Sequence, residues 1–386
     1  MPRGIARVYP ASGAVAMLPL TPANNYSQTI LFCGGTDLPA DAYGNYSFPS
    51  ANVWEHQASR DCQRITPEPA DGSPPAYLQD DDIPEPRTMG QFIILPDGTL
   101  LVVNGGTHGT AGYANITGQT TSPAAMPYGH SLATGPVGRP SIYNASAPLG
   151  SRWSTQGLSS SPIPRLYHSS ALLLPDGSVL IAGSNPNFDV NTSTIYPTTY
   201  KAEIFYPPYF AAPNRPVPSG VPSTISYGGP SFDITLPASS YTSSPNTAAQ
   251  SATVALVRPG FTTHAMNMGQ RYLQLNNTFT VNPDASIVLH VAQAPPNPRL
   301  LTPGPALLFV VVDGIPSRGA MVIVGNGEMG PQPTAATTML PESVYLNSTA
   351  GQSRSGALPV IATHTPWLYV SVMVAVPRLV GMLGFL

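Results

Sequence analysis

Prolines and glycines interrupt this sequence at short intervals along its whole length. The 386 residues include 46 prolines and 35 glycines, and no amphipathic helical pattern continues for more than about ten residues. Proline removes a backbone donor and glycine has high conformational freedom, so both residues disfavour helices and favour turns. The runs between these breaks are short and apolar, as in β-strands. The sequence therefore predicts an all-β fold.

Two stretches of the sequence repeat each other at a spacing of 78 to 79 residues. Residues 86–106 and 164–184 each contain Pro-Arg, then Leu-Pro-Asp-Gly between two apolar runs, with glycine after the second run. Residues 30–35 resemble the end of that second run. Such recurrence is typical of propeller blades, here separated by long inserts at 36–82 and 107–155. Because a propeller ordinarily closes with more than three blades, we expect N-terminal sequence to be missing.

The spacing of the apolar runs changes after a proline-rich linker at 213–222. The later apolar runs are spaced like the strands of a two-sheet sandwich, and 215–325 has the length of an immunoglobulin-like domain. We therefore expect a partial β-propeller over 1–210 followed by an immunoglobulin-like β-sandwich over 215–325. The strands expected in these two regions are 29–32, 91–95, 99–104, 170–174, 178–182, 202–206, 231–236, 252–258, 286–292, 306–313 and 319–324.

Charged residues make up only 9% of the chain, and the net charge is −3. No run of lysine or arginine provides the clustered cations that phosphate contacts need, so nucleic acid is excluded as a partner. Together, seven Asn-x-Ser/Thr sequons predict a secreted glycoprotein, although the N-terminus has no signal peptide. A start part-way through a longer protein reconciles the two observations. The sequons begin at Asn25, Asn45, Asn115, Asn144, Asn191, Asn276 and Asn347.

The chain has two cysteines, Cys33 and Cys62. In an oxidising compartment their simplest fate is one disulfide, which would close a loop of roughly 30 residues and stabilise the fold by about 3 kcal/mol. A buried free thiol is the alternative. Secretion, predicted from the sequons, favours the disulfide.

The C-terminal part consists of a Ser/Thr/Pro-rich spacer at 326–366 and an apolar tail at 367–386. Small residues at 355–357, a short spacer and the tail fit a signal for a glycolipid (GPI) anchor, which predicts contact with a membrane surface. A spanning helix is the rival interpretation, but a proline and an arginine interrupt the tail. An uninformative apolar terminus is the third.

Tyr167 and His168 stand directly before the second repeated hairpin. A phenolate oxygen beside neutral imidazoles suits Cu(II), but adjacent strand residues point to opposite faces, so the pair shares a metal only if the backbone turns there. The alternative is a purely structural role, in which the tyrosine is half-buried in a strand and the histidine hydrogen-bonds to a carbonyl. His264, on a turn between the strand ending at Arg258 and the next strand, is a third candidate ligand.

Four blocks of sequence occur in the order found in one enzyme family: PRLYHSSALLLPDG followed by GSNPN, EIFYPPYF, VALVRPGFTTHAMNMGQR, and PPNPRLLTPGPALLFVVVDGIPS. Through them the chain, up to about residue 325, resembles the glyoxal oxidase branch of the galactose oxidase-like copper radical oxidases. The resemblance implies a kelch-type propeller followed by an immunoglobulin-like (early-set) domain. It also implies that a loop of that domain enters the propeller axis and delivers one copper ligand.

The resemblance also implies roles for the site residues. Tyr167 looks like the axial ligand of one copper ion and the base for the substrate hydroxyl, and His168 and His264 look like the imidazole ligands. The implied reaction oxidises a small aldehyde or primary alcohol and reduces O₂ to H₂O₂. Members of the family also use a second tyrosine, thioether-linked to a cysteine, as a radical cofactor, and Cys33 and Cys62 do not match that cysteine. We therefore expect this chain to be inactive by itself.

An alternative from another class is a non-catalytic propeller and immunoglobulin-like module that binds surface carbohydrate or protein. In either case we expect a secreted or cell-surface monomer. His108 and His130 are weaker candidates for contact with substrate, and the acidic run at 80–82 is expected to be a solvated loop. The histidines expected to be structural or superficial are His56, His290 and His364.

Overall fold

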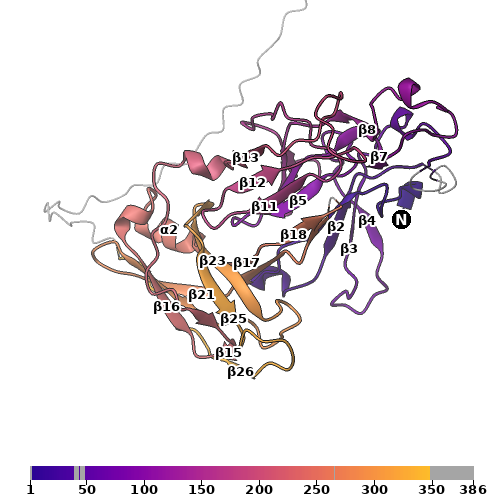
Figure 1. Cartoon of the computed structure of the whole chain (residues 1–386). Helices are drawn as coiled ribbons and strands as arrows, with labels where there is room; N and C mark the ends of the chain where they lie inside the picture. The colour runs from indigo at the N-terminus through magenta and orange to yellow at the C-terminus, as the bar shows by residue number, and fades with distance from the viewer. Residues whose placement is uncertain (1, 39–42, 44–47, 265, 348–386) are drawn as a thin grey trace, which may run out of the picture. The chain divides into compact units, whose positions relative to one another are not determined.

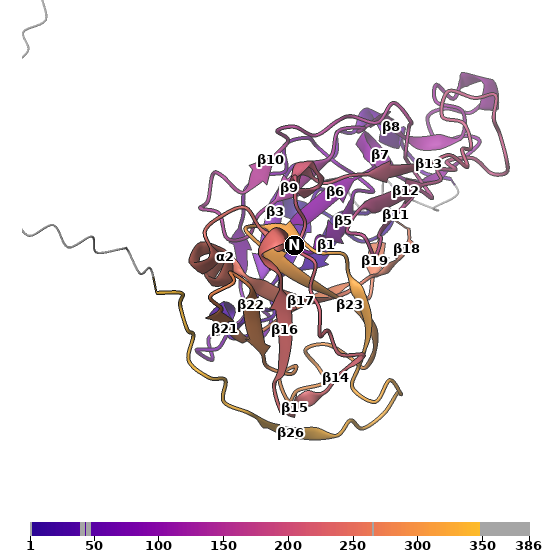
Figure 2. The same cartoon turned by 90° about the vertical axis from the view of Figure 1, so that its left-hand side faces the viewer.

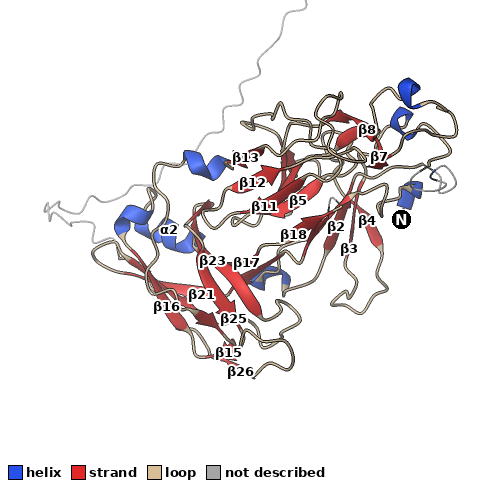
Figure 3. Cartoon of the chain, in the orientation of Figure 1, coloured by secondary structure: helices blue, strands red, loops and turns tan. Residues whose placement is uncertain are grey.

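The computed structural model describes residues 2–38, 43, 48–264 and 266–347, and the regular elements within them are mainly β-strands joined by long loops (Figure 3). The longest helix among them is α2 (Pro245–Ser251), which has seven residues. The predicted all-β class is therefore confirmed. The apolar tail and the proposed anchor site at 355–357 lie outside the described residues, as do His364 and Asn45. Among the described residues, no helix has the length and apolar character needed to cross a membrane.

The N-terminal region contains three antiparallel sheets, which we call blades 1, 2 and 3 (Figure 1). The strands of each blade are named below in the order in which they are hydrogen-bonded to one another. Blade 1 consists of β1 (Ala14–Met17), β2 (Ile30–Cys33), β3 (Cys62–Ile65) and β4 (Tyr77–Gln79). Blade 2 consists of β5 (Gln91–Ile94), β6 (Leu100–Val103), β9 (Ser141–Tyr143) and β10 (Trp153–Ser154). Blade 3 consists of β11 (Ser170–Leu173), β12 (Val179–Ala182) and β13 (Ala202–Phe205).

The two segments expected to be inserts, 36–82 and 107–155, contain the outer strands of blades 1 and 2. Those strands have only two to four residues each. Runs this short between prolines and glycines have no recognisable period, which is why the sequence did not reveal them. The second segment also holds a hairpin outside the blades, formed by β7 (Gly106–Tyr113) and β8 (Ser131–Pro136).

The Pro-Asp-Gly turns of blades 2 and 3 have the same hydrogen bonds. Oδ1 of Asp97 accepts from the backbone N–H of Thr99 at 3.0 Å, and Oδ1 of Asp176 accepts from that of Ser178 at 2.9 Å. The glycines that follow each aspartate have φ angles of 83° and 89°, a region that favours glycine. The aspartate and the glycine of each turn therefore stabilise both hairpins in the same way, as their repeated sequence predicted.

The blades pack face to face around one apolar core. Both faces of β5 and β6 in blade 2 are buried. In blades 1 and 3, buried and less buried residues alternate along the inner strands, so one face of each sheet enters the core and the other does not. Blade 2 is therefore sandwiched between the other two.

The acidic run at 80–82 is only in part the solvated loop that we expected, because Asp82 is exposed whereas Asp80 is not. Asp80 is buried and accepts hydrogen bonds from Nη1 of Arg152 at 2.6 Å and from the hydroxyl of Tyr143 at 2.9 Å. Asp81 accepts from the backbone N–H groups of Gly150 and Arg152. Because their partners lie about 70 residues away, the sequence gave no sign that these charges would be paired. They join the outer end of blade 1 to blade 2.

The C-terminal region is an immunoglobulin-like β-sandwich with its own apolar core. Figure 2 shows its strands together with the helix α2. One sheet contains β14 (Thr224–Ile225), β25 (Ala320–Val324), β23 (Gly304–Val312), β17 (Thr253–Arg258) and β20 (Arg271–Leu275), with β24 (Ile315–Pro316) beside β23. The other strands are β16 (Phe232–Leu236), β22 (Ile287–Val291) and β21 (Asn277–Val281), and the pair β15 (Tyr227–Gly229) and β26 (Thr334–Thr337).

A hairpin between β17 and β20 reaches from the sandwich to the blades. It consists of β18 (Phe261–Thr263) and β19 (Met266–Met268). The hydroxyl of Thr262 donates to the carbonyl of Ala171 in blade 3 at 2.9 Å, and Nε2 of Gln270 donates to the carbonyl of Phe92 in blade 2 at 2.8 Å. These side-chain bonds fix the hairpin against two blades.

Short 3₁₀ helices and a disulfide complete the fold. Cys33 and Cys62 lie directly opposite each other on β2 and β3 and form a disulfide. The 3₁₀ helices are η1 (Pro2–Gly4), η2 (Pro22–Asn24), η3 (Val53–Glu55), η4 (Pro123–Ala125), η5 (Pro208–Ala211) and η6 (Ala238–Ser240).

Candidate metal centre

A tight turn before β11 brings Tyr167 and His168 to the same side of the chain. The N–H of Ser169 donates to the carbonyl of Leu166 at 3.2 Å, which closes the turn, and His168 has a φ angle of 61°. As a result the rings of Tyr167 and His168 stack with their centroids 3.8 Å apart. The backbone turn that shared metal binding requires is therefore present.

The imidazole of His168 is oriented by a backbone carbonyl. Its Nδ1 lies 3.0 Å from the carbonyl oxygen of Asn185. A carbonyl can only accept a hydrogen bond, so Nδ1 carries the proton and Nε2 keeps a free lone pair. This arrangement, a ring held through one nitrogen with the other able to bind, is common for metal-binding histidines.

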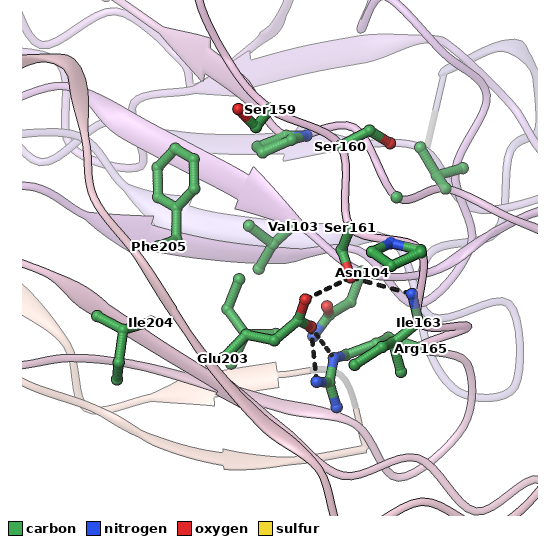
Figure 4. A pocket seen from close by; sticks show the side chains of 15 residues that line it. Val103, Asn104, Ser159, Ser160, Ser161, Ile163, Arg165, Glu203, Ile204 and Phe205 are labelled. Carbon is green, nitrogen blue, oxygen red and sulfur yellow. Dashed lines mark hydrogen bonds and ion pairs between the residues drawn. The ribbon is translucent and has the colours of Figure 1, made fainter.

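Arg165 anchors the segment that ends in Tyr167 and His168. Its guanidinium donates to the carboxylate of Glu203 on β13 at 2.7 and 3.0 Å and to the carbonyl of Gly183 at 2.7 Å. Figure 4 shows this ion pair beside a cavity of about 170 Å³ between blades 2 and 3, which no candidate metal ligand lines. The Pro-Arg of the repeated motif therefore has a structural role.

His264 reaches the same place from the sandwich. It lies at the tip of the β18–β19 hairpin with a φ angle of 52°, and its Nδ1 is 2.7 Å from the hydroxyl of Thr263. Its ring centroid is 6.0 Å from that of Tyr167 and 6.1 Å from that of His168. The structure thus brings together all three residues that the sequence singled out as candidate ligands, from two regions of the chain.

Two further tyrosines contact this group, and sequence reasoning missed both. The hydroxyl of Tyr167 donates to that of Tyr9 at 3.3 Å, and the ring of Tyr9 meets that of His264 edge-on at 5.7 Å. The ring of Tyr113, on β7, lies 6.1 Å from that of Tyr167. Tyr9 follows a short apolar segment and Tyr113 lies in a supposed insert, so neither position had a signal in a single sequence.

Burial shifts the pKa values of Tyr167 and His168 in opposite directions. Tyr167 is only 6% exposed, and burial, together with the hydrogen bond to Tyr9, raises its pKa well above the ordinary range of tyrosine. Burial lowers the pKa of His168 and the nearby His264 lowers it further, against the opposing effect of the bond to Asn185. His168 is therefore neutral at pH 7, which is the form that binds metals.

The donor set fits a copper ion better than a zinc ion. Among the described residues no group of three or more His, Cys, Asp or Glu side chains is placed to hold a metal. The group at the turn instead offers two imidazoles and the phenol oxygens of Tyr167 and Tyr9. Nitrogen and oxygen donors without thiolate suit Cu(II), whereas structural zinc sites usually contain cysteine.

His108, His130 and His290 lie outside this group of rings or at its edge. The ring of His130 packs edge-on against Phe188 at 5.1 Å, and Phe188 in turn lies 4.8 Å from Tyr113. His108 is on β7 with its Nδ1 2.9 Å from the hydroxyl of Thr107. His290 bonds Asp233 on the neighbouring strand of the sandwich.

Comparison with known families covers both regions of the chain. The family profile described as "Glyoxal oxidase N-terminus" matches residues 1–209. The profile described as "Galactose oxidase-like, Early set domain" matches residues 215–324. The kelch-type propeller and early-set sandwich implied by the sequence blocks therefore agree with the observed fold.

Known relatives agree with these matches. Aldehyde oxidase GLOX1 of Arabidopsis thaliana is 34% identical over 333 residues, which are 83% of this chain and 48% of that protein. Aldehyde oxidase GLOX of Vitis pseudoreticulata is 33% identical over 319 residues, 81% of this chain and 53% of that protein. The chain thus spans about half the length of these relatives.

A solved structure shares the fold. A fungal alcohol oxidase of the AA5 family, in complex with copper, superposes with a TM-score of 0.56 at 17% identity, over 81% of this chain and 53% of that chain. At this identity the likeness concerns the fold alone. The glyoxal oxidase profile, however, matches more than half of the sequence. The chain therefore belongs to the glyoxal oxidase family.

Proposed function

We propose that this chain holds one copper ion through Tyr167, His168 and His264 and forms part of an oxidase of small aldehydes or primary alcohols. The observation that carries the proposal is the convergence of these three side chains, from blade 3 and from the sandwich, in a member of this family. The reaction converts an aldehyde hydrate and O₂ into a carboxylic acid and H₂O₂, or a primary alcohol and O₂ into an aldehyde and H₂O₂.

The protein groups of the site hold the ligand geometry and move one proton. Copper, when bound, supplies an electron acceptor and a positive charge that favours the phenolate of Tyr167. The phenolate oxygen of Tyr167 then takes the proton of the substrate hydroxyl as general base. The hydroxyl of Tyr9, 3.3 Å from that oxygen, is the next hydrogen-bonding group. The carbonyl of Asn185 holds His168 in the tautomer that leaves Nε2 free.

We further propose that this chain does not turn over by itself. Oxidation of the substrate removes two electrons, and a copper ion cycling between Cu(II) and Cu(I) accepts one. In the family, a tyrosine joined to a cysteine by a thioether accepts the second electron. Both cysteines of this chain are already joined in the disulfide between β2 and β3, so neither can form that thioether.

Copper titration followed by electron paramagnetic resonance tests the ligand set. We expect one equivalent of Cu(II) to bind with a tetragonal spectrum showing nitrogen coupling. His264→Ala should abolish this spectrum, whereas His290→Ala, a matched change on β22 of the sandwich, should leave it intact. Loss of the spectrum in neither variant would contradict the assignment.

A coupled assay for H₂O₂ on methylglyoxal and on a primary alcohol is the second arm of this experiment. We expect no turnover by the copper-loaded chain above that of free copper. Turnover that His264→Ala removes would show that a radical cofactor bound to cysteine is not needed, and would contradict the proposed inactivity.

A further inference from the structure

The carbonyl group that orients His168 belongs to Asn185, near the start of the long loop 183–201 between β12 and β13. The backbone N–H of Asn185 donates to the carbonyl of Tyr167 at 2.7 Å. Asn185 therefore contacts both candidate ligands of blade 3, the backbone of Tyr167 through its N–H and the ring of His168 through its carbonyl. The direction of the imidazole ring thus depends on how firmly Asn185 is held.

Two local features restrict the backbone of Asn185. Pro186 follows it, and a residue before proline is largely confined to extended conformations, which limits rotation of the Asn185 carbonyl. The side-chain oxygen Oδ1 of Asn185 also accepts from the N–H of Asn187 at 3.1 Å, which closes a turn between these residues. Both features lie within the start of the loop.

The far end of the loop returns to Asn185 through Thr198. The hydroxyl of Thr198 donates to Oδ1 of Asn185 at 2.8 Å. It accepts from the N–H of Asn191 at 3.0 Å and from Nδ2 of Asn187 at 3.4 Å. A hydroxyl has one hydrogen to donate and two lone pairs, so its hydrogen-bonding capacity is fully used. Thr198 is only 6% exposed, so water does not readily replace these bonds.

Backbone bonds join the two ends of the loop at the same level. The N–H of Thr198 donates to the carbonyl of Asn191 at 2.7 Å, and the N–H of Thr199 donates to the carbonyl of Ser184 at 3.0 Å. The hydroxyl of Thr198 adds the link to the side chain of Asn185. A long loop is thereby closed at the residue whose carbonyl holds the candidate ligand.

We propose that Thr198 is a positioning residue for the copper site and acts through Asn185 on His168. This inference rests on the proposed ligand set and adds a residue to it. The hydroxyl of Thr198 holds the side chain of Asn185, and the carbonyl of Asn185 keeps the proton of His168 on Nδ1, so that Nε2 is free for copper. Removal of a hydrogen-bond partner behind a metal ligand typically weakens metal binding by about 10- to 100-fold.

Nuclear magnetic resonance on the full chain without copper tests the role of Thr198. Selective ¹⁵N labelling of histidine shows which ring nitrogen carries the proton, and His168→Gln assigns the signal of His168 among the seven histidines. We expect the Nδ1–H form in the parent at pH 7. Thr198→Val, which keeps the shape and removes the hydroxyl, should give a mixture with the Nε2–H form. Thr198→Ser, which keeps the hydroxyl, should restore the parent signal.

Thr117→Val is the matched control. Thr117 is buried, and its hydroxyl also uses its full hydrogen-bonding capacity, but none of its partners belongs to the loop 183–201. The partners are Oδ1 of Asn52 at 2.7 Å and the N–H groups of Gln119 and Thr120 at 3.1 and 2.8 Å. We expect Thr117→Val to lower the stability as Thr198→Val does and to leave the signal of His168 unchanged.

Copper titration gives a second readout. We expect the dissociation constant for Cu(II) to rise by about 10- to 100-fold in Thr198→Val and to stay unchanged in Thr198→Ser and Thr117→Val. A parent chain that binds no copper would contradict the proposed ligand set, but the protonation of His168 in the copper-free chain would still decide the role of Thr198. A His168 signal that Thr198→Val leaves unchanged, or a copper affinity that falls equally in Thr117→Val, would overturn the proposal.

Discussion

His168 and His264 share an unusual backbone conformation. Their φ angles of 61° and 52° lie in the left-handed region, which costs a residue other than glycine on the order of 1 kcal/mol. Such residues persist where the surrounding structure enforces them, and they cluster at functional sites. Here the turn closed by Ser169 and the hairpin of β18 and β19 enforce them. The sequence placed His264 on a turn, but because no glycine marks either position it did not reveal the left-handed conformation of the two histidines.

At this scale the hydroxyl of Tyr9 can be tested alone. Tyr9→Phe keeps the ring contacts with Tyr167 and His264 and removes one hydrogen bond, so we expect the free energy of unfolding to fall by about 1 kcal/mol. Tyr200→Phe, at a residue that is 77% exposed, is the control and should have no effect. Chemical denaturation measures both. Equal stability of Tyr9→Phe and the parent would show that the hydroxyl contributes nothing to the site.

At the scale of elements, buried ion pairs hold the blades and the segments between them together. Nη2 of Arg7 donates to Oδ2 of Asp61 at 2.6 Å, with both side chains nearly inaccessible, and so ties the segment before β1 to the start of β3. Burial alone would raise the pKa of Asp61, but hydrogen bonds from Arg7 and Gln63 outweigh it and hold the pKa below its ordinary value.

This pair predicts a stability that depends on pH. A carboxylate with a lowered pKa in the folded state stabilises the fold at neutral pH, and that contribution disappears as the pH falls below about 5 and through the folded pKa. Arg7→Met leaves the buried carboxylate of Asp61 without the positive charge of Arg7, so we expect the free energy of unfolding to fall by about 3–5 kcal/mol at pH 7. The loss should shrink as the pH falls through the lowered pKa of Asp61, because the protonated carboxyl carries no charge for Arg7 to neutralise.

Unfolding in urea at pH 7 and at low pH measures the difference. Arg139→Met, at an arginine whose side chain makes none of the buried ion pairs among the described residues, is the control. A destabilisation by Arg7→Met of the same size at both pH values would mean that packing of the arginine stem, and not its charge, stabilises the fold.

At the scale of the whole molecule, the surface is polar but carries few charges. We propose that attached sugars supply the remaining solubility and that the chain passes through the secretory pathway. The asparagines of five sequons are exposed, so an oligosaccharyltransferase can reach them. They are Asn25, Asn115, Asn144, Asn276 and Asn347.

Mass spectrometry after deglycosylation checks this proposal. In protein secreted from a eukaryotic host we expect conversion of Asn to Asp at Asn25, Asn115 and Asn276, and none in protein made in a bacterial cytoplasm. Asn191 is half-buried and its Oδ1 accepts from the N–H of Ser193, so we expect lower occupancy there. Unmodified asparagine at every exposed sequon would contradict a secretory route.

The sequence by itself determined what depends on near neighbours. Alternating apolar residues and the bonds within Pro-Asp-Gly turns specified the strands and hairpins, and the predicted strands recur at nearly the same residues. Tertiary structure decided what depends on distant partners. It placed His264 and Tyr9 beside Tyr167 and buried Asp80 against Arg152. Packing between segments far apart in the sequence leaves no local pattern, because any apolar face can meet any other of matching shape.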